Sequence, residues 1–287
     1  MMRPQMDESE RISRVDVTHR VLIGLRFFGQ GSYQACVGND MNHPVGRSTV
    51  GSIIEENVSA LNLIKNELIK FPTSRQEIDT AKQGLLMCNK YGVLSFQCCD
   101  ADLFIRNVNA KFPGSTHDSA IWQSSFARDA MYENYFHNGD KNTYCLADSG
   151  YPQEPWLLTP ILLENTNADE DSYNILQMSA RATIERCIGV LKGRFRCLSQ
   201  YRVLHYHPVK AANIINACSV LHNLARKFRD ENMDGWNEPQ IHPEADAYTN
   251  DDDLLDENPA AVDRRRMLEL GKKSRTNYIR NYFSNAE

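Results

Sequence analysis

No apolar run in this chain of 287 residues approaches the roughly 18 residues that a membrane-spanning helix requires. The opening residues, MMRPQMDESERISR, contain acidic side chains and no apolar central segment, which is not the pattern of a secretory signal. We therefore expect no association with a membrane.

Cysteine spacings typical of metal or redox sites are also missing. The eight cysteines include no CxxC pair and no cysteine–histidine spacing of the kind that binds zinc. We expect reduced thiols of an intracellular protein, with neither disulfides nor a zinc site.

Charge is strongly segregated along the chain. Hydrophobic residues make up 41% and charged residues 24%, as in a globular protein with a real core. The net charge is −5, yet residues 181–229 contain ten Lys or Arg and one acid, whereas residues 230–263 contain twelve acids and no Lys or Arg. Such blocks are most often solvated faces, but a basic block is also what a polyanionic partner requires.

The N-terminal region, residues 14–85, is expected to be helical after a disordered stretch at 1–13. Apolar residues recur at spacings of three and four in 15–28 and in a helix that begins at Ser48, a suitable N-cap. A short helix is expected between them at 32–37. This order of helices resembles a helix-turn-helix motif, and it also fits a generic helical bundle.

Residues 90–229 alternate between strand and helix patterns, which predicts an α/β domain. Two β-rich runs, 91–99 and 101–108, are expected to form a hairpin, and a short strand is expected at 143–147.

Helical periodicity recurs in three later segments. The expected helices are 120–135, 179–194 and 209–228. The polar residues 164–172 are expected to be mobile, and 230–287 to form an acidic linker, 230–263, followed by a basic tail whose residues 264–280 are helical.

Two aspartates stand at the ends of expected elements. Asp148 directly follows a strand, where the sites of α/β proteins commonly lie, although Asp148, Ser149 and Gly150 also fit a simple Asx turn. Asp118 opens a helix, where an aspartate often serves only as a cap.

A third carboxylate lies on a basic helix. Arg181, Glu185 and Lys192 are four and seven residues apart, so they fall on nearly one face, although the same spacing also fits an exposed ion pair. Three carboxylates beside basic residues are what two-metal phosphoryl transfer requires, because oxygen ligands hold Mg²⁺ or Mn²⁺ and cations neutralise phosphate charge.

Five stretches resemble, in order, the DDE superfamily endonuclease domain of PIF/Harbinger transposases and of the domesticated nucleases derived from them. They are FPGSTHDS from Phe112, LADSGYP from Leu146, WLLTP from Trp156, ARATIERCIGVLKGRF from Ala180 and LHN from Leu221. The stretches LRFFGQGSY from Leu25 and RSTV from Arg47 resemble the helix-turn-helix region of the same family.

The resemblance implies a ribonuclease H-like mixed sheet with flanking helices over 90–229, preceded by a small all-α region. It implies metal-dependent DNA cleavage with Mg²⁺ or Mn²⁺, and Asp118, Asp148 and Glu185 as the catalytic metal ligands, with Asp148 and Glu185 as the core pair. It also implies a nuclear location, with the cytoplasm as a second one, and a separate Myb-like DNA-binding partner protein. The residues that support the site or the DNA phosphates are Arg181, Lys192 and Arg194.

The chain departs from the family at the first catalytic aspartate. That residue lies in an Ile-Asp-Gly-Thr-His-like strand, which should fall between Gly84 and Tyr91, and no such segment is present. We therefore expect the sheet to lack one central strand and a neighbouring strand to be left unpaired. Two hypotheses follow: a metal-dependent DNA nuclease, and a DNA-binding or partner-binding module without catalysis.

Overall fold

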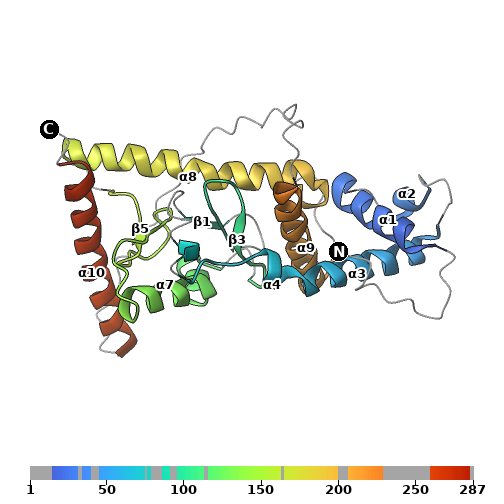
Figure 1. Ribbon diagram of the computed structural model, residues 1–287, viewed down its shortest axis with the longest axis horizontal. Coiled ribbons are helices and arrows are strands. Elements are labelled where there is room, and N and C mark those ends of the chain that lie inside the picture. Colours follow the sequence, from blue (N-terminus) through green and yellow to red (C-terminus); the bar gives the residue numbers. More distant parts are fainter. Residues whose placement is uncertain are drawn as a thin grey trace. The chain divides into compact units, whose positions relative to one another are not determined.

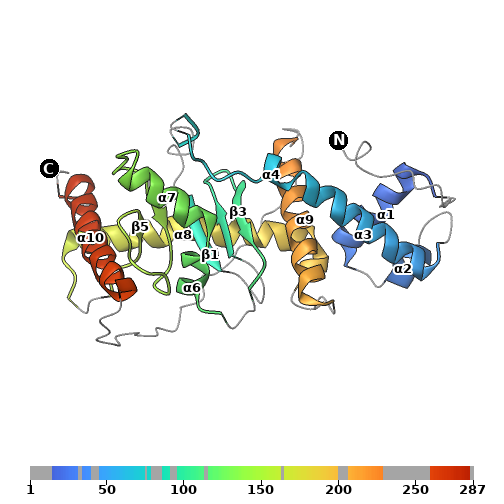
Figure 2. The same cartoon turned by 90° about the horizontal axis from the view of Figure 1, so that it is seen from below.

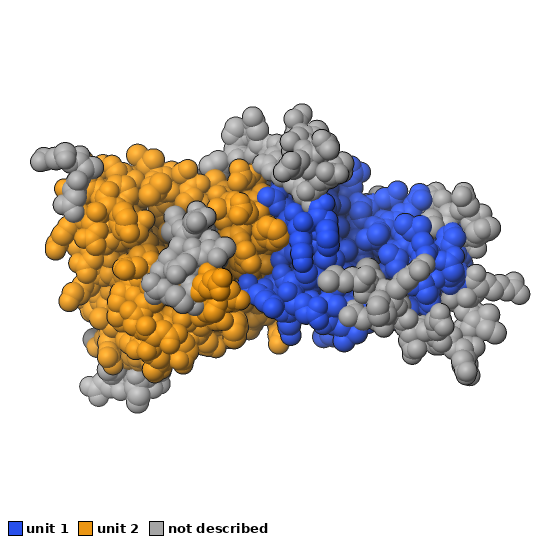
Figure 3. Space-filling view, viewed as in Figure 1, with its two compact units in different colours: residues 1–70, 188–239 blue, residues 71–187, 240–287 orange. Residues whose placement is uncertain are grey.

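The computed structural model divides the chain into two compact units (Figure 3). Unit 1 comprises Met1–Lys70 and Ile188–Pro239, and unit 2 comprises Phe71–Cys187 and Gln240–Glu287. The residues that the structure describes are 15–31, 34–39, 45–74, 76–78, 86–90, 96–112, 116–162, 165–199, 206–228 and 259–284. The stretch 1–13, expected to be disordered, and residues 230–258 of the expected linker lie outside them.

Unit 1 is helical in its described part and is organised around α3. Its elements are α1 (Val17–Gln30), α2 (Gln34–Asn39), α3 (Arg47–Leu63), α4 (Lys65–Leu68), the 3-10 helix η2 (Arg196–Leu198) and α9 (Pro208–Lys227). The helix α3 packs against α1, α2 and α9. Its buried residues recur at helical spacing and face these neighbours: Val50, Ile53, Ile54, Asn57, Val58, Ala60 and Leu61.

Both ends of α1 are set by local chemistry. The Asp16 carboxylate accepts a hydrogen bond from the backbone N–H of His19, which caps the first turn. Gly31 ends the helix with a φ of 61°, and a Cβ there would stand 2.8 Å from the backbone of Arg196. The glycine is therefore required both for the left-handed conformation and for the close approach of η2.

The start of α3 differs from the expected one. The helix α3 begins at Arg47 with Gly46 as its N-cap, so the expected N-cap Ser48 is already helical. The helix α3 also packs against α9. The resemblance to a helix-turn-helix stays a prediction.

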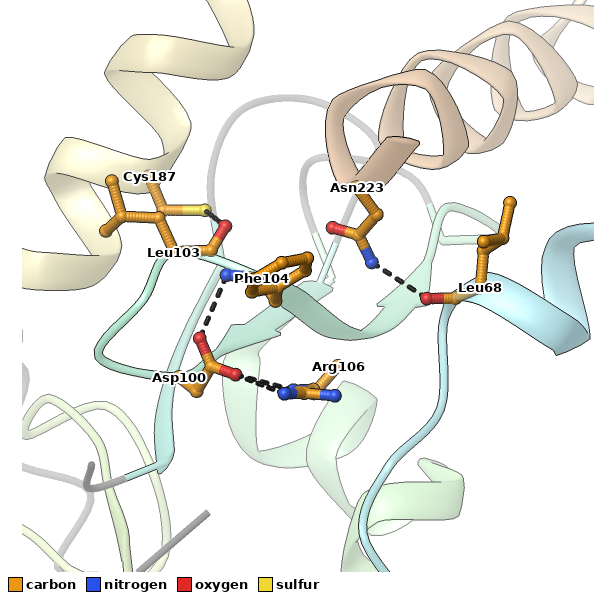
Figure 4. A network of polar contacts seen from close by, with 7 residues as sticks. All are labelled: Leu68, Asp100, Leu103, Phe104, Arg106, Cys187 and Asn223. Atoms are coloured by element: carbon orange, nitrogen blue, oxygen red, sulfur yellow. Dashed lines mark hydrogen bonds and ion pairs between the residues drawn. The ribbon is translucent and has the colours of Figure 1, made fainter. Parts of the chain in front are cut away.

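The last of the five sequence motifs has a structural role in unit 1. The side-chain amide of the buried Asn223 in α9 donates to the backbone carbonyl of Leu68, at a distance of 3.0 Å (Figure 4). This bond satisfies a carbonyl at the end of α4, where helical carbonyls lack backbone partners.

Unit 2 is built on a mixed five-stranded sheet with the order β3-β2-β1-β4-β5. The strands are β1 (Leu86–Lys90), β2 (Phe96–Cys99), β3 (Ile105–Asn109), β4 (Cys145–Leu146) and β5 (Leu157–Leu158). The strand β2 is antiparallel to both neighbours, whereas β1, β4 and β5 are parallel to one another. The expected hairpin is present as β2 and β3, and the α/β class predicted from the sequence is confirmed.

The expectation of a missing central strand is wrong. Residues Leu86–Lys90 form β1, which pairs with β2 on one side and with β4 on the other. The sequence LMCNK lacks the β-rich alternation of a strand, so the strand state depends on its neighbours in the sheet. The described part of β2 therefore keeps a partner on each side.

Helices cover the two faces of this sheet. The helices α6 (Asp118–Gln123) and α7 (Phe126–Phe136) lie on one face, and α8 (Ala168–Arg194) on the other (Figures 1 and 2). Cys98 of β2 belongs to the core cluster that includes α6 and α7, whereas the next residue, Cys99, contacts Cys187 of α8. This alternation is that of a strand buried on both faces.

The single helix expected at 120–135 is two helices. The Ser125 hydroxyl accepts a hydrogen bond from the backbone N–H of Arg128 and caps α7. The first helix therefore ends at Gln123, and a second one begins at Phe126. Because serine is a strong N-cap, this boundary is encoded locally.

The helix α8 is longer than expected and crosses unit 2. Residues 168–172, expected to be mobile, form its first turns. Asn167 and Glu170 each accept a hydrogen bond from the other's backbone N–H, which is a reciprocal cap. Further along, the Cys187 thiol lies 3.5 Å from the backbone carbonyl of Leu103, in the β2–β3 connection (Figure 4).

The expected basic tail is an ordered helix, α10 (Pro259–Tyr282), which packs beside β5 (Figure 1). Met267 joins the core cluster of unit 2, and Ile279 is also buried. The Ser274 hydroxyl donates to the carbonyl of Pro155, and Arg275 donates to the carbonyl of Thr159. The second half of the expected linker and tail is thus part of the folded unit.

The described helices include none that is long and apolar enough to cross a membrane. The six cysteines described by side chain are buried and free: Cys98, Cys99, Cys145, Cys187, Cys197 and Cys218.

The ion pair between Arg128 and Glu154 offers a test of this packing. The Glu154 side chain is nearly fully buried, and it accepts hydrogen bonds of 2.8 Å from Trp122 Nε1 and from Arg128 Nε. Replacing the arginine in Arg128→Met leaves a buried charge without its cation. The free energy of unfolding by urea should fall by about 3–5 kcal/mol.

The double variant Arg128→Met/Glu154→Gln should recover a large part of that loss, because the buried charge is then absent. The control Lys111→Met removes an exposed cation from the same unit and should change stability by less than about 0.5 kcal/mol. Equal stability of Arg128→Met and the wild-type chain would contradict the described core.

Candidate active site

Asp118 is the first residue of α6. The N-cap of this helix is His117, whose side chain makes no capping hydrogen bond. Asp118 therefore follows the cap position, and the simple capping role considered from the sequence is not the one observed. A carboxylate in the first turn is still favoured by the helix dipole.

Asp148 follows β4 by two residues and turns the chain. One of its carboxylate oxygens accepts a hydrogen bond of 2.9 Å from the backbone N–H of Gly150. This is the Asx turn that the sequence pattern allowed. The turn fixes the aspartate in place beyond the carboxyl end of the strand.

The two aspartates meet at Gly150. A Cβ on this glycine would stand 3.2 Å from Asp148 Oδ1 and 3.4 Å from Asp118 Oδ2. Both carboxylates thus approach one point from different elements, 30 positions apart in the sequence. A side chain at this position would contact both carboxylates, and glycine has none.

Gln177, which sequence reasoning missed, ties α8 to this turn. Its buried side-chain amide donates a hydrogen bond of 2.7 Å to the backbone carbonyl of Ala147, the residue before Asp148. A buried amide at the centre of an otherwise apolar helix face is the signal that could have found it. The contact holds one face of α8 beside the end of β4.

Arg181 and Glu185 lie one and two turns beyond Gln177 on α8. Arg181 Nη2 and Glu185 Oε1 are 3.4 Å apart, and both side chains are mostly buried, with about 15% exposed. The ion pair considered from the spacing is therefore present, at the margin of the buried face. Glu185 lies about 12 Å along the helix axis from Gln177, at 1.5 Å per residue.

Glu185 does not form a ready metal-binding group with the two aspartates. Within the described ranges, no three or more His, Cys, Asp or Glu side chains are arranged to hold a metal ion. The structure brings Asp118 and Asp148 together, and it places Glu185 on the helix that covers the same end of β4.

Lys192 and Arg194 occupy the last turn of α8, which belongs to unit 1. Lys192 is half-buried, and this burial lowers the pKa of its ammonium group from the ordinary value. Their predicted role at the DNA phosphates stays a prediction.

The strand β1 carries no acidic residue. Its parallel register pairs Leu86 with Cys145 and Met87 with Leu146, and a continuation of that register by two residues sets position 89 level with Asp148. The residue there is Asn89. The strand that should carry the family's first catalytic aspartate is therefore present as β1, but β1 contains no carboxylate.

The donor chemistry of the pair fits a hard divalent cation. Two carboxylates that converge from separate elements repel each other, and a shared Mg²⁺ or Mn²⁺ relieves that repulsion through oxygen ligands. Asp118 and Asp148 are therefore the residues that would hold such an ion.

Residues 81–223 match the model of a family described as "DDE superfamily endonuclease". This stretch contains all five strands and both aspartates. No solved structure matches the chain.

Relatives extend the match to most of the chain. A human protein named "Putative nuclease HARBI1" is 27% identical over 267 residues, which cover 82% of this chain and 74% of the relative. Its mouse counterpart is 26% identical over 290 residues, covering 90% and 80%. "Protein ALP1-like" of Arabidopsis thaliana is 26% identical over 152 residues, covering 50% and 37%. The resemblance to Harbinger-derived nucleases predicted from the motifs is confirmed.

The absence of a side chain at position 150 leads to a prediction about metal binding. In Gly150→Ala, the added methyl group stands 3.2 Å from Asp148 Oδ1, so that carboxylate must shift by a few tenths of an ångström. Isothermal titration calorimetry should show a Mn²⁺ affinity about tenfold weaker, the scale at which supporting residues act on metal sites. The control Gly29→Ala, where a Cβ meets nothing within 4 Å, should leave it unchanged. Equal affinities in all three chains, or no affinity in the wild-type chain, would contradict the site.

Proposed function

We propose that this chain, a member of the DDE superfamily endonucleases through residues 81–223, cleaves phosphodiester bonds of DNA with a divalent metal ion. The observation that carries the proposal is the convergence of Asp118 and Asp148 at Gly150. These two residues lie in two of the motifs shared with the Harbinger-derived nucleases.

The sheet supports a ribonuclease H-like architecture for this domain. It is mixed, it has helices on both faces, and the aspartates meet beyond the carboxyl end of β4. The mixed sheet and the flanking helices are features that the family resemblance implied.

The proposed site divides its tasks among the chain's own residues. Asp118 and Asp148 hold the ion, and Glu185 is the proposed third oxygen ligand. Arg181 orients the Glu185 carboxylate at 3.4 Å and supplies positive charge for the phosphate. When bound, Mg²⁺ or Mn²⁺ would acidify the attacking water and stabilise the leaving oxygen, with two ions sharing these tasks.

The setting of the activity is proposed from the family resemblance. DNA is the substrate, a nuclear location fits that substrate, and a Myb-like partner protein directs the chain to its target. Lys192 and Arg194 support the DNA phosphates.

A second candidate function is DNA or partner binding without cleavage. The observation that favours it is the sequence of β1, LMCNK, which has no acid at the strand between β2 and β4. Mg²⁺ is usually held by only one or two carboxylates together with waters and substrate phosphates, so a missing carboxylate on β1 removes one of the few protein ligands available to the ion.

Plasmid nicking in Mn²⁺ separates the two candidates. We expect slow nicking by the wild-type chain and none by Asp148→Asn. Asn89→Asp places a carboxylate level with Asp148 and should raise the rate at least about tenfold, equivalent to about 1.4 kcal/mol in the barrier.

Lys90→Asp is the matched control, because it adds an aspartate to the same strand one position further. An equal gain in Lys90→Asp would contradict the register argument. Folded wild-type and Asn89→Asp chains that both fail to nick would refute the nuclease proposal and leave binding without cleavage.

A further inference from the structure

The outward face of α10 carries a concentrated positive charge. Between residues 264 and 286 the chain has seven Lys or Arg and one acid, Glu269. Six of the basic residues are exposed, and five of these fall within an arc of about 120° at 3.6 residues per turn. We call these five the basic stripe: Arg265, Arg266, Lys272, Lys273 and Arg280.

The opposite face of α10 is fixed to unit 2. Met267 and Ile279 are buried, and a Cβ on Gly271 would stand 2.9 Å from the backbone carbonyl oxygen of Gln153. Arg275 points inward and donates to the carbonyls of Thr159 and Pro160 at 3.1 Å each. The orientation of the helix, and with it the outward direction of the stripe, is therefore set by packing.

We propose that the basic stripe binds the phosphate backbone of duplex DNA. A membrane-surface helix inserts an apolar face into lipid, but the apolar face of α10 is already occupied by the core of its own unit. A helix that offers positive charge but no free apolar face is suited to bind the negatively charged phosphate backbone of a nucleic acid. Three of the five residues are arginines, whose planar fork suits phosphate oxygens.

The length of the stripe matches several phosphates. From Arg265 to Arg280 the helix rises about 22 Å, at 1.5 Å per residue. Duplex DNA carries one charge per about 1.7 Å of its axis, so a helix lying along the backbone meets more than one phosphate.

The stripe is anchored on the segment that leads out of the candidate site. Gly271 lies against Gln153 and Glu154, only a few residues after Asp148 in the chain. The inference rests on DNA as the substrate of the proposed nuclease, and it assigns α10 the task of holding that DNA on unit 2.

Glu269 opposes this task. It lies within the arc of the stripe, and its carboxylate is 3.4 Å from the Lys272 ammonium, with both side chains more than half exposed. A carboxylate there repels phosphate and competes for one cation. Its removal should strengthen binding, an outcome that misfolding does not produce.

Fluorescence anisotropy with a labelled DNA duplex, in EDTA so that no cleavage occurs, tests the stripe in the full-length chain. The triple variant Lys272→Gln/Lys273→Gln/Arg280→Gln should lose about tenfold or more in affinity. The slope of log affinity against log salt, taken between about 50 and 200 mM, should fall by about 2 to 3. Glu269→Gln should bind a few-fold more tightly.

The matched control, Arg26→Gln/Lys70→Gln/Lys111→Gln, removes the same charge elsewhere and should change the slope by less than about 1. An unchanged slope in the stripe variant, or equal losses in both triple variants, would overturn the proposal. So would stronger retention of the wild-type chain by an acidic peptide or anionic vesicles than by DNA. Because the readout is binding without metal, a failure of nicking leaves this test intact, and unchanged binding leaves the nuclease proposal intact.

Discussion

The candidate site depends on the approach of two carboxylates, Asp118 and Asp148, to Gly150, a residue without a side chain. Asp118 comes from the first turn of α6, and Asp148 comes from the Asx turn after β4. Their oxygens approach within 3.4 Å of the point where a Cβ on Gly150 would stand. Such a pair repels unless a cation lies nearby, so the surrounding packing must hold the elements in place. A cation between the two carboxylates would relieve this repulsion, which links the pair to the proposed metal-dependent chemistry.

The surrounding structure supplies that support through contacts on three sides of the turn. Gln177 of α8 holds the carbonyl of Ala147, immediately before Asp148. After the turn, the buried Glu154 is fixed by Trp122 of α6 and Arg128 of α7. The helix α10 then covers the same segment at close range. Residues far apart in the sequence thus fix the chain on both sides of Asp148.

The sequence predicted those features that short-range chemistry encodes. The Asx turn at Asp148, the hairpin of β2 and β3, and the spacing of Arg181 and Glu185 all depend on neighbouring residues. The strand β1 was missed because LMCNK becomes a strand only through pairing on both sides. The sequence did not predict that α10 packs into the fold, because its few buried residues can be recognised only from their contacts with β5 and the segment before it. The reciprocal cap at Asn167 was visible in the sequence and was overlooked.

X-ray anomalous scattering from crystals of the full-length chain grown with Mn²⁺ tests the central claim most directly. The account predicts a manganese peak with carboxylate oxygens of Asp118 and Asp148 as ligands, beside Gly150. A manganese ion bound only at other residues, or no peak near these aspartates in well-ordered crystals, would contradict it.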